Sequence, residues 1–220
     1  MERKDLFFIA FVDIKPGLDE EAYEILEGLK GEAGVEPLLI GRIFERADIL
    51  LLLHSEKLEA LDDYLIRNVR KLAAAEELVV VPIYEFTLLP SFNSVVELDS
   101  DMGASGQRDE TSEETSELDE FLLIVAKIDI APGMDRQVHQ AVVSIHDSQE
   151  GVIPLIAGHT FHSKEFDLVL FFLSRNLDSA WKFGKRLRSM NGVWDTELSL
   201  IAHFEALAPL ERLRELASAE

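Results

Sequence analysis

Histidine offers the widest choice of chemistry in this sequence, which contains six. His159 and His162 are three residues apart in a strand-like segment, so their side chains point to opposite faces and would not share a metal ion. His139 and His146 lie two helical turns apart on one helix face, but no acidic ligand recurs with them. We therefore predict no metal site and no cofactor. Should the protein bind haem, His203 in the last expected strand is the candidate ligand.

Basic side chains form two groups that could suggest an anion site. Both groups lie toward the end of an expected helix, where positive side chains offset the helix dipole, so we interpret them as structural. They are Arg67, Arg70 and Lys71, and Lys182, Lys185, Arg186 and Arg188. The sequence has no Gly-rich phosphate loop, no GxSxG nucleophile motif and no cysteine, so we predict no catalytic residue.

The chain is strongly acidic, with a net charge of −21 over 220 residues. Residues 1–96 hold 19 acidic and 10 basic residues, residues 97–120 hold 10 and 1, and residues 121–220 hold 13 and 10. Such a surface repels nucleic-acid phosphates and anionic membranes, so we expect neither as a direct partner. The absence of cysteine favours a cytoplasmic location.

The sequence contains an internal repeat. The segment FVDIKPGLDEEAYEIL aligns with KIDIAPGMDRQVHQAV at an offset of 116 residues, and GVEPLLIGRIF aligns with GVIPLIAGHTF at 117. ADILLLLHS then aligns with FDLVLFFLS at 119. Matching glycines, prolines and aspartates in one order indicate a tandem duplication, with the slips falling in loops.

Each copy predicts the order strand, helix, strand, strand, helix, strand. Residues 6–14 and 121–130 suit first strands ended by Pro-Gly, and Asp19 and Asp135 suit helix N-caps. The second helices have apolar residues at helical spacing that should face inward: Leu58, Leu61, Leu65 and Leu72, and Leu177, Ala180, Gly184 and Leu187. The order βαββαβ is the ferredoxin-like motif, so the fold class is α+β with two ferredoxin-like repeats.

The strands are apolar on both faces, as in LFFIAFV, ILLLL and LVLFFL. A sheet with helices on one face only would show alternation, so its second face must also be covered. The simplest cover is the sister repeat, packed sheet to sheet as a pseudo-dimer of the dimeric α/β-barrel type. Pairing with a repeat of another chain is the alternative.

Four regions follow from these patterns. They are a first repeat (1–96), an acidic linker (97–120), a second repeat (121–206) and a C-terminal helix (207–220). The linker is rich in Ser, Thr, Glu and Asp, which predicts a disordered, solvated tether, with regulation by phosphorylation as the alternative. In the last segment Pro209 fits the first helical position, and Leu210, Leu213 and Leu216 form an apolar stripe.

Both repeats resemble the ligand-binding (RAM) domain of Lrp/AsnC-type regulators. Copy two carries most of that pattern, in APG, GVIPLIAG, FDLVLFF and NGVWDTELSLI. Copy one keeps KPG, GVEPLLIG and ADILLLL but has Ala47 before the Asp and AEELVVVP at its close. The family's DNA-binding helix-turn-helix has no counterpart, since copy one occupies its place.

The resemblance implies a ligand site. Gly41, Asp48, Gly158 and Asp167 match the loop that borders the family's pocket, where an Asp could hold an amino group. Thr196 matches the closing strand. The alternative is that the glycines serve tight turns and the aspartates their hydrogen bonds.

The resemblance further implies a non-enzymatic sensor of an amino-acid-like effector, which forms homo-oligomers and acts with a regulator protein in transcription regulation. A different class stays open: dimeric α/β barrels also occur among haem-dependent and cofactor-free oxygenases. A third alternative is a structural assembly protein with an empty groove.

Overall fold

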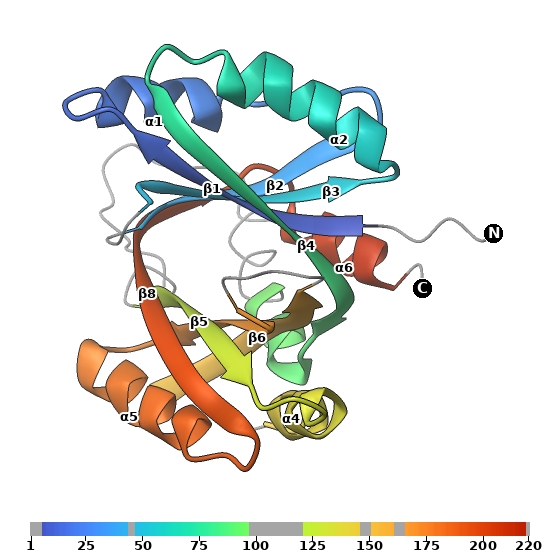
Figure 1. Ribbon diagram of the computed structural model, residues 1–220, viewed down its shortest axis with the longest axis vertical. Coiled ribbons are helices and arrows are strands. Elements are labelled where there is room, and N and C mark those ends of the chain that lie inside the picture. The colour runs from blue at the N-terminus through green and yellow to red at the C-terminus, as the bar shows by residue number, and fades with distance from the viewer. Residues whose placement is uncertain (1–5, 44–46, 97–120, 146–150, 161–165, 219–220) are drawn as a thin grey trace, which may run out of the picture. The chain divides into compact units, whose positions relative to one another are not determined.

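The computed structural model describes residues 6–43, 47–96, 121–145, 151–160 and 166–218 (Figure 1). The expected linker, 97–120, and two of the histidines, His146 and His162, lie outside the described residues. The four-region division of the sequence stays a prediction. The chain forms two compact units: unit 1 comprises Met1–Phe86, His159–Glu165 and Ser199–Glu220, and unit 2 comprises Thr87–Gly158 and Phe166–Leu198.

Each copy of the repeat folds in the predicted order of elements. The first contains β1 (Leu6–Ile14), α1 (Asp19–Glu27), β2 (Val35–Ile43), β3 (Ile49–Ser55), α2 (Leu58–Leu65), a π-helical segment (Ile66–Arg70) and β4 (Ala75–Leu88). Residues 90–96 are also helical. The second contains β5 (Leu122–Ile130), α4 (Asp135–Val143), β6 (Val152–Thr160), β7 (Leu168–Ser174), α5 (Leu177–Arg188) and β8 (Val193–Ala206), followed by α6 (Leu210–Ala217).

The predicted fold class is confirmed: α+β, with two ferredoxin-like repeats of the dimeric α/β-barrel type. The strands hydrogen-bond in the closed order β1-β3-β2-β8-β5-β7-β6-β4. Within unit 1, β3 pairs with both β1 and β2, and β2 pairs with the C-terminal half of β8, all antiparallel.

In unit 1 the helices α1 and α2 cover one face of the sheet (Figure 1). Alternate residues of β1, such as Phe8 and Ala10, point into that layer and pack with Tyr23 of α1 and Tyr64 of α2. Ile9, which points to the opposite face, is also fully buried. Both faces of β1 are therefore covered, in agreement with its unbroken apolar sequence.

The repeated glycines of the sequence lie in turns. Gly17 and Gly133, after each first strand, have φ of 82° and 80°, while Gly34 and Gly151, before each second strand, have 83° and 75°. This left-handed region disfavours any residue with a Cβ. The shared Pro-Gly and Gly-Val patterns therefore follow from the turns that a βαββαβ repeat makes here.

Two sequence predictions about the helices are wrong. Asp19 and Asp135 are the first helical residues rather than N-caps, although a carboxylate there still interacts favourably with the helix dipole. Leu58 and Leu177 were expected to face inward but are 62% and 60% exposed. Each is the first residue of its helix, ahead of the residues that pack on the sheet, such as Leu61.

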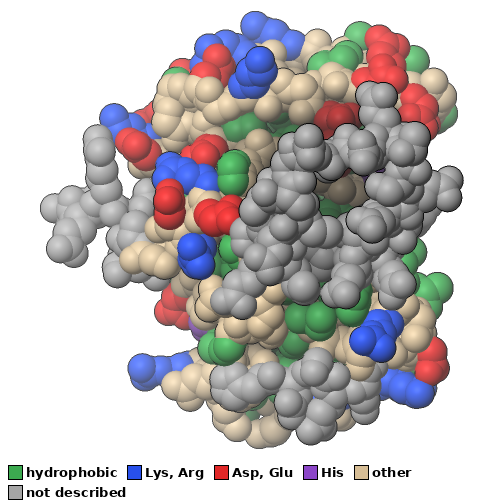
Figure 2. Space-filling model, turned by 180° about the vertical axis from the view of Figure 1, so that it is seen from behind, with side chains coloured by type: hydrophobic (Ala, Val, Ile, Leu, Met, Phe, Trp, Pro, Cys, Tyr) green, Lys and Arg blue, Asp and Glu red, His purple; other side chains and the backbone are tan. Residues whose placement is uncertain are grey.

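The surface mixes charges of both signs. Figure 2 shows acidic and basic side chains interspersed on the face that it draws, with apolar side chains between them. Within the described part of the chain, no helix has the length and apolar character needed to cross a bilayer.

Candidate functional site

A cavity of about 560 Å³ opens in unit 1. A volume of this size suits a small organic molecule. Its walls come from the loop between α1 and β2, the facing ends of β2 and β3, and the segment that leads into α6. The lining residues are Leu29, Lys30, Gly31, Glu32, Ala33, Gly34, Val35, Glu36, Pro37, His54, Glu56, Leu207, Ala208, Pro209 and Arg212.

His54 is the buried histidine of this cavity, with 4% of its surface exposed. It lies on β3, directly opposite Phe7 of β1 and Glu36 of β2. Directly opposed residues of antiparallel strands share a face, so the imidazole and the Glu36 carboxylate are neighbours at the cavity wall. The His54 ring also packs against Phe7, at 5.4 Å between ring centroids. The sheet thus fixes the position of a proton-accepting group at the cavity.

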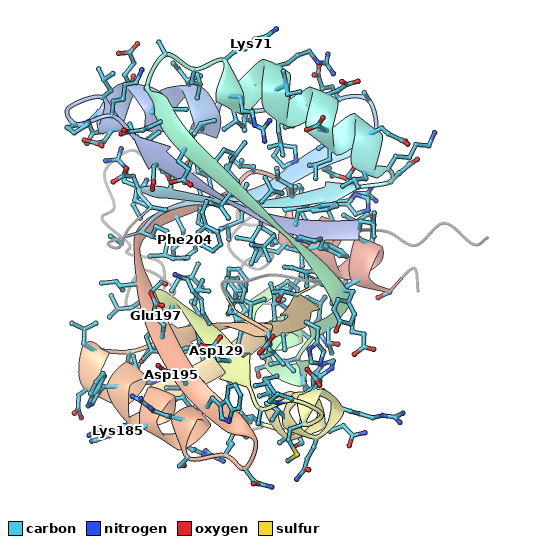
Figure 3. The ribbon with its side chains drawn as sticks, in the orientation of Figure 1. Lys71, Asp129, Lys185, Asp195, Glu197 and Phe204 are labelled. Carbon is cyan, nitrogen blue, oxygen red and sulfur yellow. The ribbon has the colours of Figure 1, made fainter. Side chains whose placement is uncertain are left out.

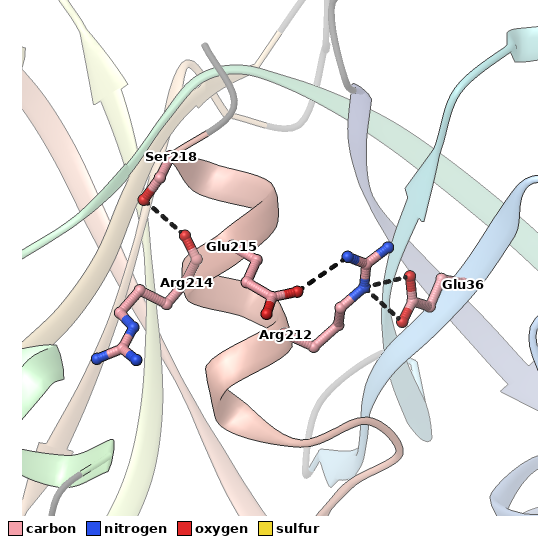
Figure 4. Close-up of polar contacts among 5 residues, drawn as sticks. All are labelled: Glu36, Arg212, Arg214, Glu215 and Ser218. Carbon is pink, nitrogen blue, oxygen red and sulfur yellow. Dashed lines mark hydrogen bonds and ion pairs between the residues drawn. The ribbon is translucent and has the colours of Figure 1, made fainter.

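Arg212 of α6 lines the cavity, and Figure 4 shows its contacts with Glu36 and Glu215. Its Nε donates to both carboxylate oxygens of Glu36, at 3.1 and 3.0 Å, and its Nη1 donates to Glu215 at 3.1 Å. The hydrogen bonds to Glu215 and Glu36 raise the pKa of Arg212, so the guanidinium stays charged. The backbone N–H of Leu207 also donates to the Leu38 carbonyl at 3.0 Å. The start of α6 is therefore held against β2 by both charge and backbone.

The rim of the cavity includes a strained turn. Glu32 and Val35 exchange two backbone hydrogen bonds of 2.9 Å each, which leaves Ala33 and Gly34 as a two-residue loop. Both have positive φ, 53° and 83°, as in a type I′ turn. Alanine is disfavoured in this region, because its Cβ crowds the backbone. Backbone strain of this kind is often found at functional sites.

A second polar cluster of unit 1 lies between α1 and the end of β8. The ring of His203 packs on Tyr23, with centroids 5.5 Å apart, and its Nε2 lies 3.1 Å from Glu205 Oε1. A hydrogen bond between the side chains of Glu27 and Glu205 raises the pKa of Glu27, because two adjacent carboxylates favour sharing a proton. Burial raises the pKa of Tyr23 to about 12.

Arg42 joins the Tyr23 end of this polar cluster to the acidic start of α1. Its guanidinium lies 4.3 Å from the centre of the Tyr23 ring and forms two hydrogen bonds of 2.7 Å to Glu20. The bond to Arg42 lowers the pKa of Glu20, so this pair stays ionised.

The aspartates predicted as ligand residues make the same contact in both copies. Asp48 Oδ2 accepts from the Ile14 N–H, and Asp167 Oδ2 accepts from the Ile130 N–H, each at 2.7 Å. These bonds tie the start of each third strand to the end of the first. Neither aspartate lines the cavity.

In unit 2, Asp129 on β5 and Asp195 on β8 lie close together (Figure 3). Burial, with the charges of Asp167 and Asp195, raises the pKa of Asp129. The predicted aspartate of copy two therefore belongs to a small carboxylate cluster at the end of its sheet.

The other three predicted ligand residues are also separate from the cavity. Gly41 lies where β2 approaches β8 so closely that an added Cβ would come within 2.5 Å of Ile201 Cγ2. Gly158 is buried in β6, and the backbone N–H of Thr196 donates to Asp195 at 2.7 Å. The binding role of Gly41, Asp48, Gly158, Asp167 and Thr196 stays a prediction.

The described histidines do not fit a haem. His203, the sequence candidate, has 57% of its side chain exposed and belongs to the polar cluster with Tyr23. His159 is buried with its ring stacked on Tyr84 and its Nε2 4.0 Å from Glu85 Oε2, and His139 is half-buried on α4. The cavity at His54 is lined by Glu32, Glu36 and Glu56 against Lys30 and Arg212, so its lining offers no surplus of cations to haem propionates.

Unit 2 also has a filled layer between its helices and its sheet. Phe172 of β7 and Phe183 of α5 pack edge to face, with centroids 4.9 Å apart. At Gly184 an added Cβ would come within 2.7 Å of Leu198, so α5 already lies directly on β8. A porphyrin would require this layer to open. Neither these histidines nor the layer between α5 and its sheet therefore supports a haem site.

No family model matches this chain, and no curated protein matches it in sequence. Solved structures share its fold. A candidate monooxygenase from Lactobacillus acidophilus NCFM has a TM-score of 0.53 at 13% identity, covering 93% of this chain and 97% of its own. A variant of chlorite dismutase from Candidatus Nitrospira defluvii has 0.51 at 14%, covering 99% and 97%. A further candidate chlorite dismutase has 0.50 at 12%, covering 97% and 98%.

These comparisons overturn the resemblance to Lrp/AsnC ligand-binding domains. The similar structures are a candidate monooxygenase and chlorite dismutases, not regulator domains. The expectation of a non-enzymatic sensor in transcription regulation is therefore wrong, and these structures give no support to an amino-acid effector or a regulator partner. The physical reason is that left-handed turns of the βαββαβ fold require the shared glycines Gly17, Gly34, Gly133 and Gly151, so the pattern indicates the fold and not a regulator family.

Sequence reasoning missed both His54 and the cavity. A signal for His54 was present, since it ends the run ILLLLH in a strand expected to be buried on both faces. No local pattern could have revealed the pairing of Glu36 with Arg212, which are 176 residues apart.

Proposed function

We propose that the protein is an enzyme of the dimeric α/β-barrel oxygenase type, which uses dioxygen to oxidise a small organic substrate in the cavity of unit 1. The observation that carries this proposal is His54, a buried imidazole fixed by the sheet at the wall of a cavity of about 560 Å³. Histidine is the side chain most often used as a general base. The likeness in fold to a candidate monooxygenase supports the same reaction class.

The reaction we infer begins with proton abstraction by His54. A methylene or hydroxyl activated by an aromatic ring or carbonyl would lose a proton to the imidazole, and the resulting anion would react with dioxygen. When a methylene becomes a carbonyl, one dioxygen supplies the carbonyl oxygen and one water. When a quinol becomes its quinone, the dioxygen leaves as hydrogen peroxide. Neither route needs an external reductant. Lys30, which also lines the cavity, would stabilise the negative charge that develops.

The lining favours a neutral substrate, such as a quinol, over an anion. Three carboxylates, those of Glu32, Glu36 and Glu56, line the cavity against two cations, Lys30 and Arg212, and Arg212 is already paired with Glu36 and Glu215. An anion such as chlorite, which the names of two similar structures imply, would enter against this field. Haem does not fit the described histidines, so the proposal involves no haem step.

Two further expectations belong to this proposal. The dimeric α/β-barrel fold fits a homo-oligomer, and we propose that the protein self-associates. A cytoplasmic location, expected from the cysteine-free sequence, goes with it.

The test is oxygen consumption by the purified chain with a panel of quinols and anthrone-type methylene compounds. His54→Asn keeps the size of the side chain but removes the base, and we expect it to lower kcat by roughly 100-fold or more. His203→Asn is the matched control, because it alters an exposed histidine outside the cavity. It should leave kcat unchanged.

Three results would contradict this function. They are a His54→Asn protein that keeps full kcat, equal losses in both variants, and no oxygen uptake with any substrate of the panel. A Soret band in the protein as purified, or a stoichiometric spectral shift on titration with haemin, would replace the haem-free mechanism by a haem-dependent one.

A further inference from the structure

The second helix of copy one ends in a π-helical turn. α2 (Leu58–Leu65) continues directly into the π segment, Ile66–Arg70, whereas its counterpart α5 is an unbroken α-helix over Leu177–Arg188. A π turn closes its hydrogen bonds one residue later than an α-helix does, so it accommodates one additional residue. Such turns usually occur singly within α-helices and are frequent at functional sites. The two copies of the repeat therefore differ at this turn.

The duplication shows that copy one has one residue more than copy two at the π segment. Before it, the buried Leu61 of α2 corresponds to the buried Ala180 of α5, at an offset of 119 residues. After it, the buried Val69 corresponds to the buried Leu187, at an offset of 118. The carbonyls of Val69 and Leu187 each accept from the backbone N–H three residues later, at 3.0 Å, which supports the second match. The π segment thus absorbs an extra residue and leaves the buried positions on both sides in place.

Two side chains of the π segment bind to the backbone of the preceding turn. In an α-helix the carbonyls of Asp63 and Tyr64 accept from the backbone N–H groups four residues later. Here the side chains of those later residues donate to the same carbonyls, Arg67 Nε to Asp63 at 3.2 Å and Asn68 Nδ2 to Tyr64 at 3.1 Å. The π segment therefore restrains the direction of both side chains.

The same two side chains contact the wall of the cavity. Arg67 Nη1 lies 3.2 Å from Glu32 Oε1, and Asn68 Nδ2 lies 3.4 Å from the same oxygen. One turn earlier, the Tyr64 hydroxyl donates to the Lys30 carbonyl at 3.1 Å. Lys30 and Glu32 both line the cavity, in the loop that precedes β2. Three contacts from one side of this helix thus fix the loop, since residues three and four apart share a helix face.

We propose that the π segment determines the specificity of the cavity, because it holds Arg67 and Asn68 on Glu32 and thereby balances one carboxylate of the lining. The inference rests on the proposed function, since it takes the cavity as the substrate site. Without Arg67, Glu32 would present an unbalanced negative charge to the ligand, which favours cations and opposes the anion that forms on proton transfer to His54. The side chains of Arg67 and Glu32 are 48% and 46% exposed, so solvent limits the effect to a few-fold in affinity.

The test measures binding to the full-length chain under anaerobic conditions, so that no turnover takes place. Calorimetry gives Kd for two probes of the same shape, neutral 1-naphthalenemethanol and the cation 1-naphthylmethylammonium. We expect Arg67→Ala to shift the ratio of the two Kd values toward the cation by roughly three- to fivefold. Arg70→Ala is the matched control, because this exposed residue of the same π segment has no contact with Glu32 in the described part of the chain. It should leave the ratio unchanged.

Deletion of Ile66 tests the turn itself, because it gives the second helix of copy one the length that α5 has. The buried positions then keep the spacing found in copy two, so we expect a folded protein with a Tm near that of the parent. Its Kd ratio should nevertheless shift as in Arg67→Ala. A purely structural role of the π segment predicts the reverse, a lower Tm and equal weakening of both probes. If the shortened chain does not fold, the Arg67 variants decide the question.

A double-mutant cycle identifies Glu32 as the group on which Arg67 acts. In a Glu32→Gln background no carboxylate remains to be balanced, so Arg67→Ala should leave the Kd ratio unchanged. The inference is overturned by an unchanged ratio in Arg67→Ala alone, by an equal shift in Arg70→Ala, or by a full effect of Arg67→Ala in the Glu32→Gln background.

The proposed function can fail separately. Binding of neither probe to the unaltered chain would remove the cavity as a substrate site and refute both proposals. A shifted Kd ratio in a chain that consumes no oxygen would retain the role of the π segment in binding and discard the oxygenase reaction.

Discussion

Tyr23 and Tyr64 are two buried tyrosines whose hydroxyl groups differ in hydrogen bonding. Both lie in the layer between the helices and the sheet of unit 1, and both are at most 2% exposed. The Tyr64 hydroxyl donates to the backbone carbonyl of Lys30 at 3.1 Å, whereas the Tyr23 hydroxyl has no hydrogen-bond partner among the described residues. Replacing each by phenylalanine therefore removes the same atom from two different environments.

The expected effects have opposite sign. Tyr64→Phe removes a hydrogen bond and leaves the Lys30 carbonyl without its side-chain donor, which costs about 1–2 kcal/mol. Tyr23→Phe removes a buried hydroxyl that makes no hydrogen bond, so it should be neutral or stabilise by up to ~1 kcal/mol. For a chain of this size 1 kcal/mol corresponds to a Tm change of roughly 2–4 °C. The two variants should thus melt several degrees apart, on either side of the parent protein.

Urea denaturation followed by circular dichroism gives the free energies, and calorimetry gives Tm. The dependence of stability on pH above pH 10 supplies a second measurement, since burial raises the pKa of both tyrosines to about 12. A raised folded pKa means that stability is fully present below the unfolded value near 10 and is lost as pH rises toward 12. Each Phe variant should therefore lose stability less steeply above pH 10. Equal destabilisation by both variants would refute the idea that the hydrogen bond of the Tyr64 hydroxyl makes the difference between the two sites.

Three further predictions follow from local geometry. Ala33→Asn places a residue suited to the left-handed first position of a type I′ turn, and we expect a gain of about 0.5–1 kcal/mol in urea denaturation. Gly41→Ala forces a Cβ to within 2.5 Å of Ile201 and should destabilise unit 1 by about 1–3 kcal/mol, seen as a lower Tm. Because the folded pKa of Glu27 is raised, its contribution to stability is present at low pH and lost as pH rises above 4.5; Glu27→Gln should flatten that part of the Tm–pH curve.

Most of the fold could be predicted from the sequence, because the repeat presents each signal twice. The first strands, the Pro-Gly turns and the two-sided burial of β3 all follow from local composition. The errors occurred at element ends. Leu58 and Leu177 fit the apolar spacing, but the first turn of a helix extends beyond the sheet, so spacing alone does not determine their burial.

The candidate site was much less predictable. The cavity is built by residues from three distant segments, represented by Lys30, His54 and Arg212, and only folding brings them together. Family resemblance pointed to Asp48 and Asp167, whose binding role stays a prediction; in the structure each accepts a hydrogen bond from the first strand of its copy. A short motif that satisfies backbone groups recurs wherever the fold recurs and so carries little information about function.

Unit 1 combines two segments that lie far apart in the sequence, Met1–Phe86 and Ser199–Glu220. Glu36 and Arg212, which line the cavity, come from the first and the second of these segments. During synthesis the first repeat leaves the ribosome long before the strand end and helix that complete it. The edge of β2 therefore stays unpaired until β8 has been synthesised. Loss of residues 199–217 would leave β2 without the partner strand and the helix that complete unit 1.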